Sequence, residues 1–294
     1  MALLLVHLAG SGTFDDFGQD PTDVVRRRAQ FGFDRPFLEQ YATWMRGALT
    51  LDFGRSVRFD RPVAALLGER IGPTVLLGTV AFALALAIGL PAGVYTGSAP
   101  SRAGARVIRA ASVLLISTPP LVTALLLVFV AVRTGILPSG GLDTGDGGIL
   151  GWTAGAARYL PLPALALALP IAASLERVQS RALQSSLGER SIIAARARGV
   201  PALRTVWVHA WRLSLPPVLG LLGIIFGSVL SGSLIVEVVL SWPGLGGLMH
   251  QALVARDLHL AAACAAAGAL FLSAGLTLAE LALFVADPRT QEPA

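Results

Sequence analysis

The sequence predicts an all-α protein, a polytopic bundle of about six membrane-spanning helices. Of its 294 residues, 54% are hydrophobic and 14% are charged, which gives a mean hydropathy of +0.68. Soluble domains carry about 25% charged residues, so this composition favours a membrane protein. The apolar residues also gather in stretches long enough to cross a hydrocarbon core of about 30 Å. Between these stretches, arginine is concentrated in two connecting segments, which defines an orientation.

Five apolar stretches are long enough to be spans. They occupy residues 74–94, 110–132, 159–175, 213–236 and 258–279, and the last continues towards residue 286. A sixth stretch, residues 1–10, is shorter. At about 1.5 Å per residue it covers only about half of the hydrocarbon core. We therefore expect it to be a partial first transmembrane helix, with the native start of the chain further upstream.

The distribution of arginine predicts the orientation, because basic residues accumulate in cytoplasmic loops. Residues 97–109 contain three Arg and no acid, and residues 177–214 contain seven Arg and one acid. Residues 11–72, by contrast, balance nine Arg against nine acids. We therefore predict an extracytoplasmic helical segment over 11–72, a membrane domain over 73–287 and a cytoplasmic tail over 288–294.

The composition excludes several activities. All 23 basic residues are arginine, so the chain lacks the lysine of a Walker A loop and the lysine that holds pyridoxal phosphate. The single cysteine, Cys264, cannot form an internal disulfide or a zinc site of several thiolates. The four histidines show no ligand spacing. We expect a chain that is not an enzyme and that holds no nucleotide, metal or other cofactor of its own.

The basic segment 177–214 is predicted to contain two short helices at an angle. The first covers residues 192–198 and stops at Gly199, because the residue after a helix often adopts a left-handed backbone conformation, which glycine favours. Pro201 then opens the second helix, because its fixed φ and missing N–H cost nothing in a first turn.

Small side chains leave one face of the first of these helices flat. They are Ala194, Ala195 and Ala197, and arginines surround them in the sequence. A flat helix of this kind suits docking into a groove on a soluble partner. An amphipathic helix lying on anionic lipid headgroups would show the same pattern. The residues alone leave both interpretations open.

The sequence AARARG in this segment resembles the EAA loop of ABC-importer permeases, in the variant of the dipeptide, oligopeptide and nickel group. A basic, apolar helix and a proline near the next span follow it, as in that group. Further stretches resemble the same group in the same order along the chain: residues 31–56, 61–78, 137–138, 236–249 and 287–289. Ile193 departs from the wider superfamily, which has an acidic residue at this point, so no salt bridge is expected from it.

This resemblance implies a type I ABC-importer transmembrane domain in the bacterial cytoplasmic (inner) membrane. It implies a permease subunit that moves di- or oligopeptides and forms the translocation path with a second, homologous permease. The other implied protein partners are two ATPase subunits, which bind ATP and Mg²⁺, and an extracytoplasmic substrate-binding protein. Membrane lipid is expected to surround the chain, and no nucleic acid is expected to bind it. The same architecture is compatible with import of nickel or another small solute. A nucleotide-independent secondary carrier is the alternative from another class.

The resemblance also assigns two sets of site residues. The ATPase-coupling loop comprises Ala194, Ala195, Arg198, Gly199, Val200, Pro201 and Leu203. The candidates for an outer gate are Glu237, Trp242, Pro243 and Gly244.

A stripe of small residues marks the fourth of the five long stretches. Gly223, Gly227 and Ser231 recur every four residues and therefore lie on one side of a helix. Such a stripe lets another helix approach closely. It faces either the subunit's own bundle or the central pathway, and the sequence leaves this choice open.

Two prolines and two acids are also placed within or beside the spans. Pro119 and Pro120 interrupt helical hydrogen bonds and predict a kink in the span over 110–132, of the kind that can line a cavity. Glu176 and Glu237 are expected at span ends, where their side chains reach water.

Overall fold

The structure is a computed structural model, and it describes residues 36–138, 140–141 and 155–286. The main helices in these ranges are α3 (Phe37–Leu49), α4 (Val63–Ser98), α5 (Ala103–Ser117), α6 (Pro120–Thr134), α8 (Pro161–Leu187), α9 (Arg190–Ala197), α10 (Ala202–Arg204), the π-helix η2 (Thr205–Ala210), α11 (Trp211–Gly232), α12 (Leu234–Val239), α13 (Leu245–Val254) and α14 (Leu258–Ala286). Within the described residues, β pairing is limited to one isolated bridge between Arg55 and Pro62. The all-α prediction is confirmed.

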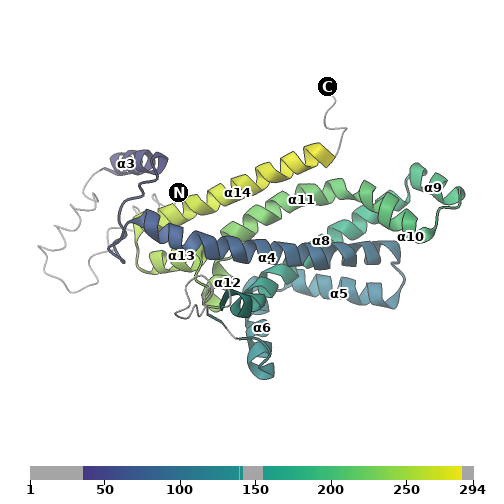
Figure 1. The fold of residues 1–294 in the computed structure, drawn as a ribbon, viewed down its shortest axis with the longest axis horizontal. Helices are drawn as coiled ribbons and strands as arrows, with labels where there is room; N and C mark the ends of the chain where they lie inside the picture. The colour runs from purple at the N-terminus through teal and green to yellow at the C-terminus, as the bar shows by residue number, and fades with distance from the viewer. Residues whose placement is uncertain (1–35, 139, 142–154, 287–294) are drawn as a thin grey trace, which may run out of the picture.

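Four long helices, α4, α8, α11 and α14, lie lengthwise along the molecule, and α5 runs beside α4 and α8 (Figure 1). At one end, which we call the α9 end, the chain between α8 and α11 folds into α9 and α10 (Figure 1). At the opposite end, which we call the α13 end, α3 and α13 lie near the first turns of α4 and α14 (Figure 1). The bundle thus has two ends of different construction.

Four of the five long predicted spans are confirmed as helices long and apolar enough to cross a membrane: Val63–Ser98, Pro161–Leu187, Ala202–Gly227 and Leu258–Leu281. Two of them, α4 and α8, extend well beyond the apolar stretches that predicted them, whereas α11 ends at Gly232, before the predicted end at residue 236. The predicted segment boundary at residue 72, for example, falls inside α4. Residues 1–10 and the tail 288–294 lie outside the described residues.

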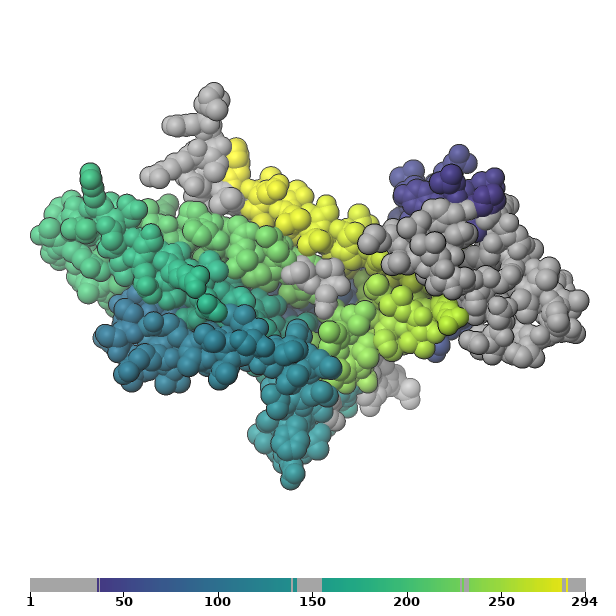
Figure 2. All heavy atoms as spheres, turned by 180° about the vertical axis from the view of Figure 1, so that it is seen from behind, coloured from purple at the N-terminus to yellow at the C-terminus, as the bar shows by residue number. Residues whose placement is uncertain are grey.

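The kink predicted in the span over 110–132 is a complete break: the chain divides there into α5 and α6, which are bent by 113° relative to each other and count together as at most one span. Thr118 and Pro119 have ψ angles of 125° and 142°, so two consecutive residues are extended. A proline drives the residue before it out of the helical region. Here Pro119 and Pro120 follow one another, so this happens twice and the helix breaks. As a result α6 projects from the side of the bundle (Figure 2).

Glycines at every fourth position, Gly89, Gly93 and Gly97, bring α4 against α8. A Cβ atom at Gly93 would lie 2.6 Å from Cβ of Gln179, and one at Gly89 would lie 2.6 Å from the carbonyl oxygen of Ala172. Larger side chains would push the two helices apart, so this close approach depends on glycine. The spacing of these glycines is a sequence signal that the motifs above do not include.

Gly223 and Gly227 pack against α14 of the same subunit. A Cβ atom at Gly227 would lie 2.7 Å from Cα of Leu272, and one at Gly275 of α14 would lie 2.7 Å from the backbone nitrogen of Gly227. Of the two interpretations of this stripe, the geometry therefore gives packing within the subunit's own bundle. Ser231 lies further along α11, and its side chain is outside the described residues.

Candidate functional site

Gly199 closes α9 with a Schellman motif. It has a φ of +84°, in the left-handed region that glycine enters without steric cost. Its N–H donates to the carbonyl oxygen of Arg196 at 2.9 Å, and the N–H of Val200 donates to the carbonyl oxygen of Ala195 at 3.2 Å. These two bonds satisfy carbonyl groups that a helix end leaves open. Gly199 ends the helix as its place in the sequence predicts, and α9 begins slightly earlier than predicted, at Arg190.

The second predicted helix begins where it is expected but does not stay short. Pro201 is the N-cap of α10, which continues through η2 into α11. The prediction of a separate second helix is wrong, because no glycine or proline interrupts the chain between Ala202 and Ser214. Thr205 is fully buried, and its hydroxyl donates to the carbonyl oxygens of Val200 at 3.4 Å and Pro201 at 3.1 Å. The loop after α9 is thereby tied to the helix that enters the bundle.

The residues predicted for the coupling loop lie on two sides of α9. Ala195 is buried, together with Ile192, whose side chain joins a small core made with α4, α8 and η2. Val200 is half-buried. The remaining members are exposed: Ala194, Arg198, Gly199, Pro201 and Leu203. Ala195 therefore supports α9 from beneath, whereas Ala194 lies on the face that a partner can reach.

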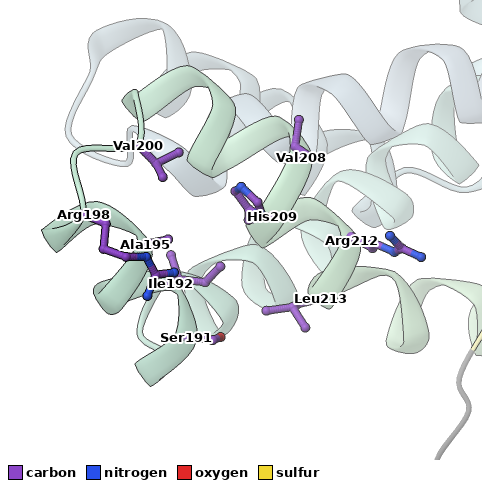
Figure 3. Close-up of a pocket in the computed structure, with 9 residues that line it drawn as sticks. All are labelled: Ser191, Ile192, Ala195, Arg198, Val200, Val208, His209, Arg212 and Leu213. Atoms are coloured by element: carbon purple, nitrogen blue, oxygen red, sulfur yellow. The ribbon is translucent and has the colours of Figure 1, made fainter.

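A hollow of about 510 Å³ separates α9 from the segment formed by η2 and the start of α11 (Figure 3). It is lined by Ser191, Ile192, Ala195, Arg198, Val200, Val208, His209, Arg212 and Leu213. Most of these side chains are apolar, and the charged ones are both arginine. The hollow can therefore receive apolar side chains accompanied by negative charge.

At the α13 end, the structure brings the outer-gate candidates together. Glu237 and Trp242 are 1% and 2% exposed, and Gly244 lies directly against the Glu237 carboxylate. Pro243 is half-buried beside them. The indole Nε1 of Trp242 donates to the carbonyl oxygen of Pro73 in α4 at 3.0 Å. The expectation that Glu237 reaches water is wrong, because α4 and α13 pack over it.

Glu176 was also expected to reach water, and it too is buried, with 1% exposure. Because α8 continues to Leu187, Glu176 lies well inside a helix, where its carboxylate accepts a hydrogen bond from the hydroxyl of Thr96 in α4. One turn later, Nε2 of Gln179 donates to the hydroxyl of Ser214 in α11 at 2.7 Å. These two contacts join three helices of the bundle. The apolar stretch that predicted this span stopped at residue 175, so the sequence offered no sign of the burial.

A second, smaller hollow of about 240 Å³ lies among α6, α8, α11 and α12. Pro120 lines it, and Ser174 is the one polar side chain among its lining residues. Pro119 is exposed at the corner between α5 and α6. Of the residues predicted to pack helices or line a path, Pro120 thus borders an open space, whereas Gly223 and Gly227 face α14.

The chain from the last turns of α4 onward also matches a known family. Residues 89–292 match the family described as binding-protein-dependent transport system inner membrane component. The chain belongs to this family. It is therefore a membrane component of a transport system and not the catalytic subunit of one.

Two relatives in this family cover most of the chain. A protein of Brucella ovis named as a candidate peptide permease is 34% identical over 267 residues, which cover 89% of this chain and 82% of the relative. The oligopeptide transport system permease protein OppB of Mycobacterium bovis is 32% identical over 281 residues, which cover 92% of this chain and 86% of the relative.

A solved structure has the same fold. A chain in the inward-facing MetNI methionine ABC transporter superposes with a TM-score of 0.56 at 19% identity, covering 76% of this chain and 96% of that chain. The predicted fold class, the transmembrane domain of an ABC importer, is confirmed.

Proposed function

We propose that this chain is a permease subunit of an ATP-driven importer that moves peptides across the bacterial inner membrane. The names of the Brucella ovis and Mycobacterium bovis relatives, which match along most of both chains, support peptides as the substrate class. The observation that carries the proposal is the α9 surface. There a short exposed helix, closed by Gly199, stands beyond the membrane helices at one end of the bundle (Figure 1).

An ATPase subunit in the cytoplasm is the proposed partner of the α9 surface. Large apolar side chains are exposed there, with Ile193 at 55%, Leu203 at 73% and Val208 at 53%. Exposed apolar groups with a polar rim favour a protein contact. A helix that lies on lipid headgroups presents a convex apolar face. Here Val208 lines a hollow between two helical segments together with Val200 and Leu213, which supports a docked protein over a lipid surface.

The orientation follows from the arginines at the two ends of the bundle. The connection between α4 and α5, with Arg102, Arg106 and Arg109 in or near it, lies at the α9 end (Figure 1). The arginines of segment 177–214 lie at the same end. Two basic segments at one end support a cytoplasmic α9 end. Since α14 runs from the α13 end towards the α9 end, the C-terminal tail is also proposed to be cytoplasmic (Figure 1).

The remaining proposed partners are a second, homologous permease and an extracytoplasmic substrate-binding protein. The permease is proposed to form the translocation path with this chain. The binding protein is proposed to approach the α13 end, because that end is extracytoplasmic in the proposed orientation.

Reconstitution of the assembled complex in liposomes tests the proposal. The permease would be co-expressed with a second permease, ATPases and a binding protein from the same genome, and uptake of labelled di- and tripeptides would be followed with and without ATP. We expect accumulation of peptide that requires both ATP and the binding protein. Nickel chloride serves as the alternative cargo. ATP-dependent uptake of nickel without any uptake of peptide would refute the proposed substrate class.

A further inference from the structure

We propose that Glu237 is a positioning residue for transport, which fixes the turn between α12 and α13 so that ATP hydrolysis is coupled to movement of substrate. The inference rests on the proposed function as an importer. It concerns the α13 end of the bundle, about which the names of the relatives say nothing.

Both carboxylate oxygens of Glu237 are held by donors from different segments. Oε1 accepts hydrogen bonds from the hydroxyl of Thr74 at 3.0 Å and from the hydroxyl of Ser233 at 2.5 Å. Oε2 accepts a hydrogen bond from the backbone N–H of Gly247 at 3.0 Å. Gly247 is the third residue of α13, so the carboxylate lies at the start of that helix, where backbone N–H groups have no partner within the helix.

The turn between the two helices is shaped around this carboxylate. A Cβ atom at Gly244 would collide with the carboxylate group itself, so only glycine fits there while Glu237 keeps its position. The hydroxyl of Thr74 also accepts a hydrogen bond from the backbone N–H of Leu245 at 2.7 Å. Together with the bond from Trp242 to α4, these contacts fasten α12, the turn and α13 to a single point on α4.

The fastened segment also borders the smaller hollow. Ile235 and Val236, which precede Glu237 in α12, line it together with residues of α6, α8 and α11. Leu240, at the end of α12, accepts a hydrogen bond from the N–H of Gly141, in the segment after α6, at 2.7 Å. A shift of α12 would therefore change the hollow and the segment after α6 at the same time.

The presence of a carboxylate at position 237 indicates that this side chain does more than fill space between helices. Burial of an ionisable group within a membrane bundle is costly, and an apolar side chain of similar size would fill the same space without that cost. A carboxylate adds a directional link, because its two oxygens accept hydrogen bonds at once from Thr74 of α4, from Ser233, which precedes α12, and from Gly247 of α13. We infer that this directional link keeps the segment in register with α4 when the bundle changes conformation.

The variant Glu237→Gln tests this role with little change in volume. Its amide oxygen can still accept from the two hydroxyls, but its NH₂ group would face the N–H of Gly247, donor against donor. Thr74→Val removes the bridging hydroxyl and keeps the branched shape. Glu69→Gln is the matched control, since Glu69 lies on α4 near Thr74 but forms an exposed ion pair with Arg61.

The experiment measures peptide imported per ATP hydrolysed by the complete complex in proteoliposomes, together with complex assembly and thermal unfolding. We expect Glu237→Gln and Thr74→Val to lower this ratio at least fivefold while ATP hydrolysis continues, and Glu69→Gln to leave it unchanged. An unchanged ratio in the first two variants would overturn the proposal. This includes the case in which transport and ATP hydrolysis fall by the same factor, because that pattern indicates general damage to the complex.

A further variant covers the case in which Glu237→Gln does not assemble. Ser233→Ala removes one donor and leaves the carboxylate and its other bonds in place, so a lowered ratio is expected there as well, and an unchanged ratio in both Ser233→Ala and Thr74→Val would overturn the role. Failure of the wild-type complex to import any peptide would count against the proposed function instead. The two proposals can thus fail separately.

Discussion

The backbone of Gly199 provides the sharpest test of the α9 surface. With φ at +84°, this residue is in a region that other L-residues enter only at a steric cost. Among the described residues, apart from its two chain neighbours, no atom lies within 4 Å of the position that a Cβ would occupy, so a substitution meets no steric obstacle there. The effect of Gly199→Ala would therefore come from the backbone alone.

The cost of a left-handed conformation is about 1–2 kcal/mol for a residue with a Cβ atom. If this strain is relieved when the end of α9 changes shape, the fraction of chains with the docking conformation falls by a factor of about 5 to 30. We expect the affinity for the ATPase to fall by up to the same factor. Gly199→Asn should lie between glycine and alanine, because Asn tolerates the left-handed region better.

Gly188 supplies a matched control in the same segment. It caps α8 with a φ of −86°, and the nearest atom to its Cβ position is a carbonyl oxygen at 3.4 Å, an ordinary contact. Gly188→Ala should therefore leave ATPase binding unchanged. The assay is the dissociation constant of the purified ATPase for the permease pair in nanodiscs. Equal losses in Gly188→Ala and Gly199→Ala, or no loss in Gly199→Ala, would refute the reasoning.

Three further outcomes are expected. Gly93→Ala should destabilise the subunit by about 1–3 kcal/mol, because it forces α4 away from α8. Gly72→Ala on the same helix should not, because its Cβ would contact no other part of the described structure within 4 Å, and thermal unfolding in detergent compares the two variants. Ala195→Asp should lower the thermal stability of the subunit, because it buries an unpaired charge. Ala194→Asp, on the exposed side of α9, should impair co-purification with the ATPase at unchanged thermal stability. The reverse pattern would show that the buried and exposed sides of α9 are misassigned. Trp242→Phe should cost about 1 kcal/mol, from the lost bond to α4, and an unchanged unfolding midpoint would contradict that contribution.

The break between α5 and α6 shows where sequence reasoning stops short. Pro119 and Pro120 located the interruption correctly, because the loss of N–H groups is a local property of the residues. They did not determine that the interruption is a bend of 113°. That angle depends on the surface against which α6 packs, and in the structure its buried residues Ala124 and Ala131 pack with residues of α8 and α12.

The burial of the two glutamates could likewise not be predicted from the local sequence. An acid next to an apolar stretch is ordinarily expected to reach water. Glu176 and Glu237 do not, since α4 supplies a hydroxyl to each of them from a distant part of the sequence, through Thr96 and Thr74. Nothing near either glutamate in the sequence indicates which helix will lie beside it.

The sequence by itself determined the membrane class, four of the long spans and the helix stop at Gly199, because hydropathy and backbone preference act locally along the chain; the orientation from the arginine distribution stays a prediction. It also carried the family resemblance, which the match over residues 89–292 confirms. Only the tertiary structure decided that Gly223 and Gly227 face α14, that Ala195 is buried while Ala194 is exposed, and that Glu237 fastens α13 to α4. These features depend on which helices meet, and that is fixed by shape complementarity and hydrogen bonding between segments far apart in the chain.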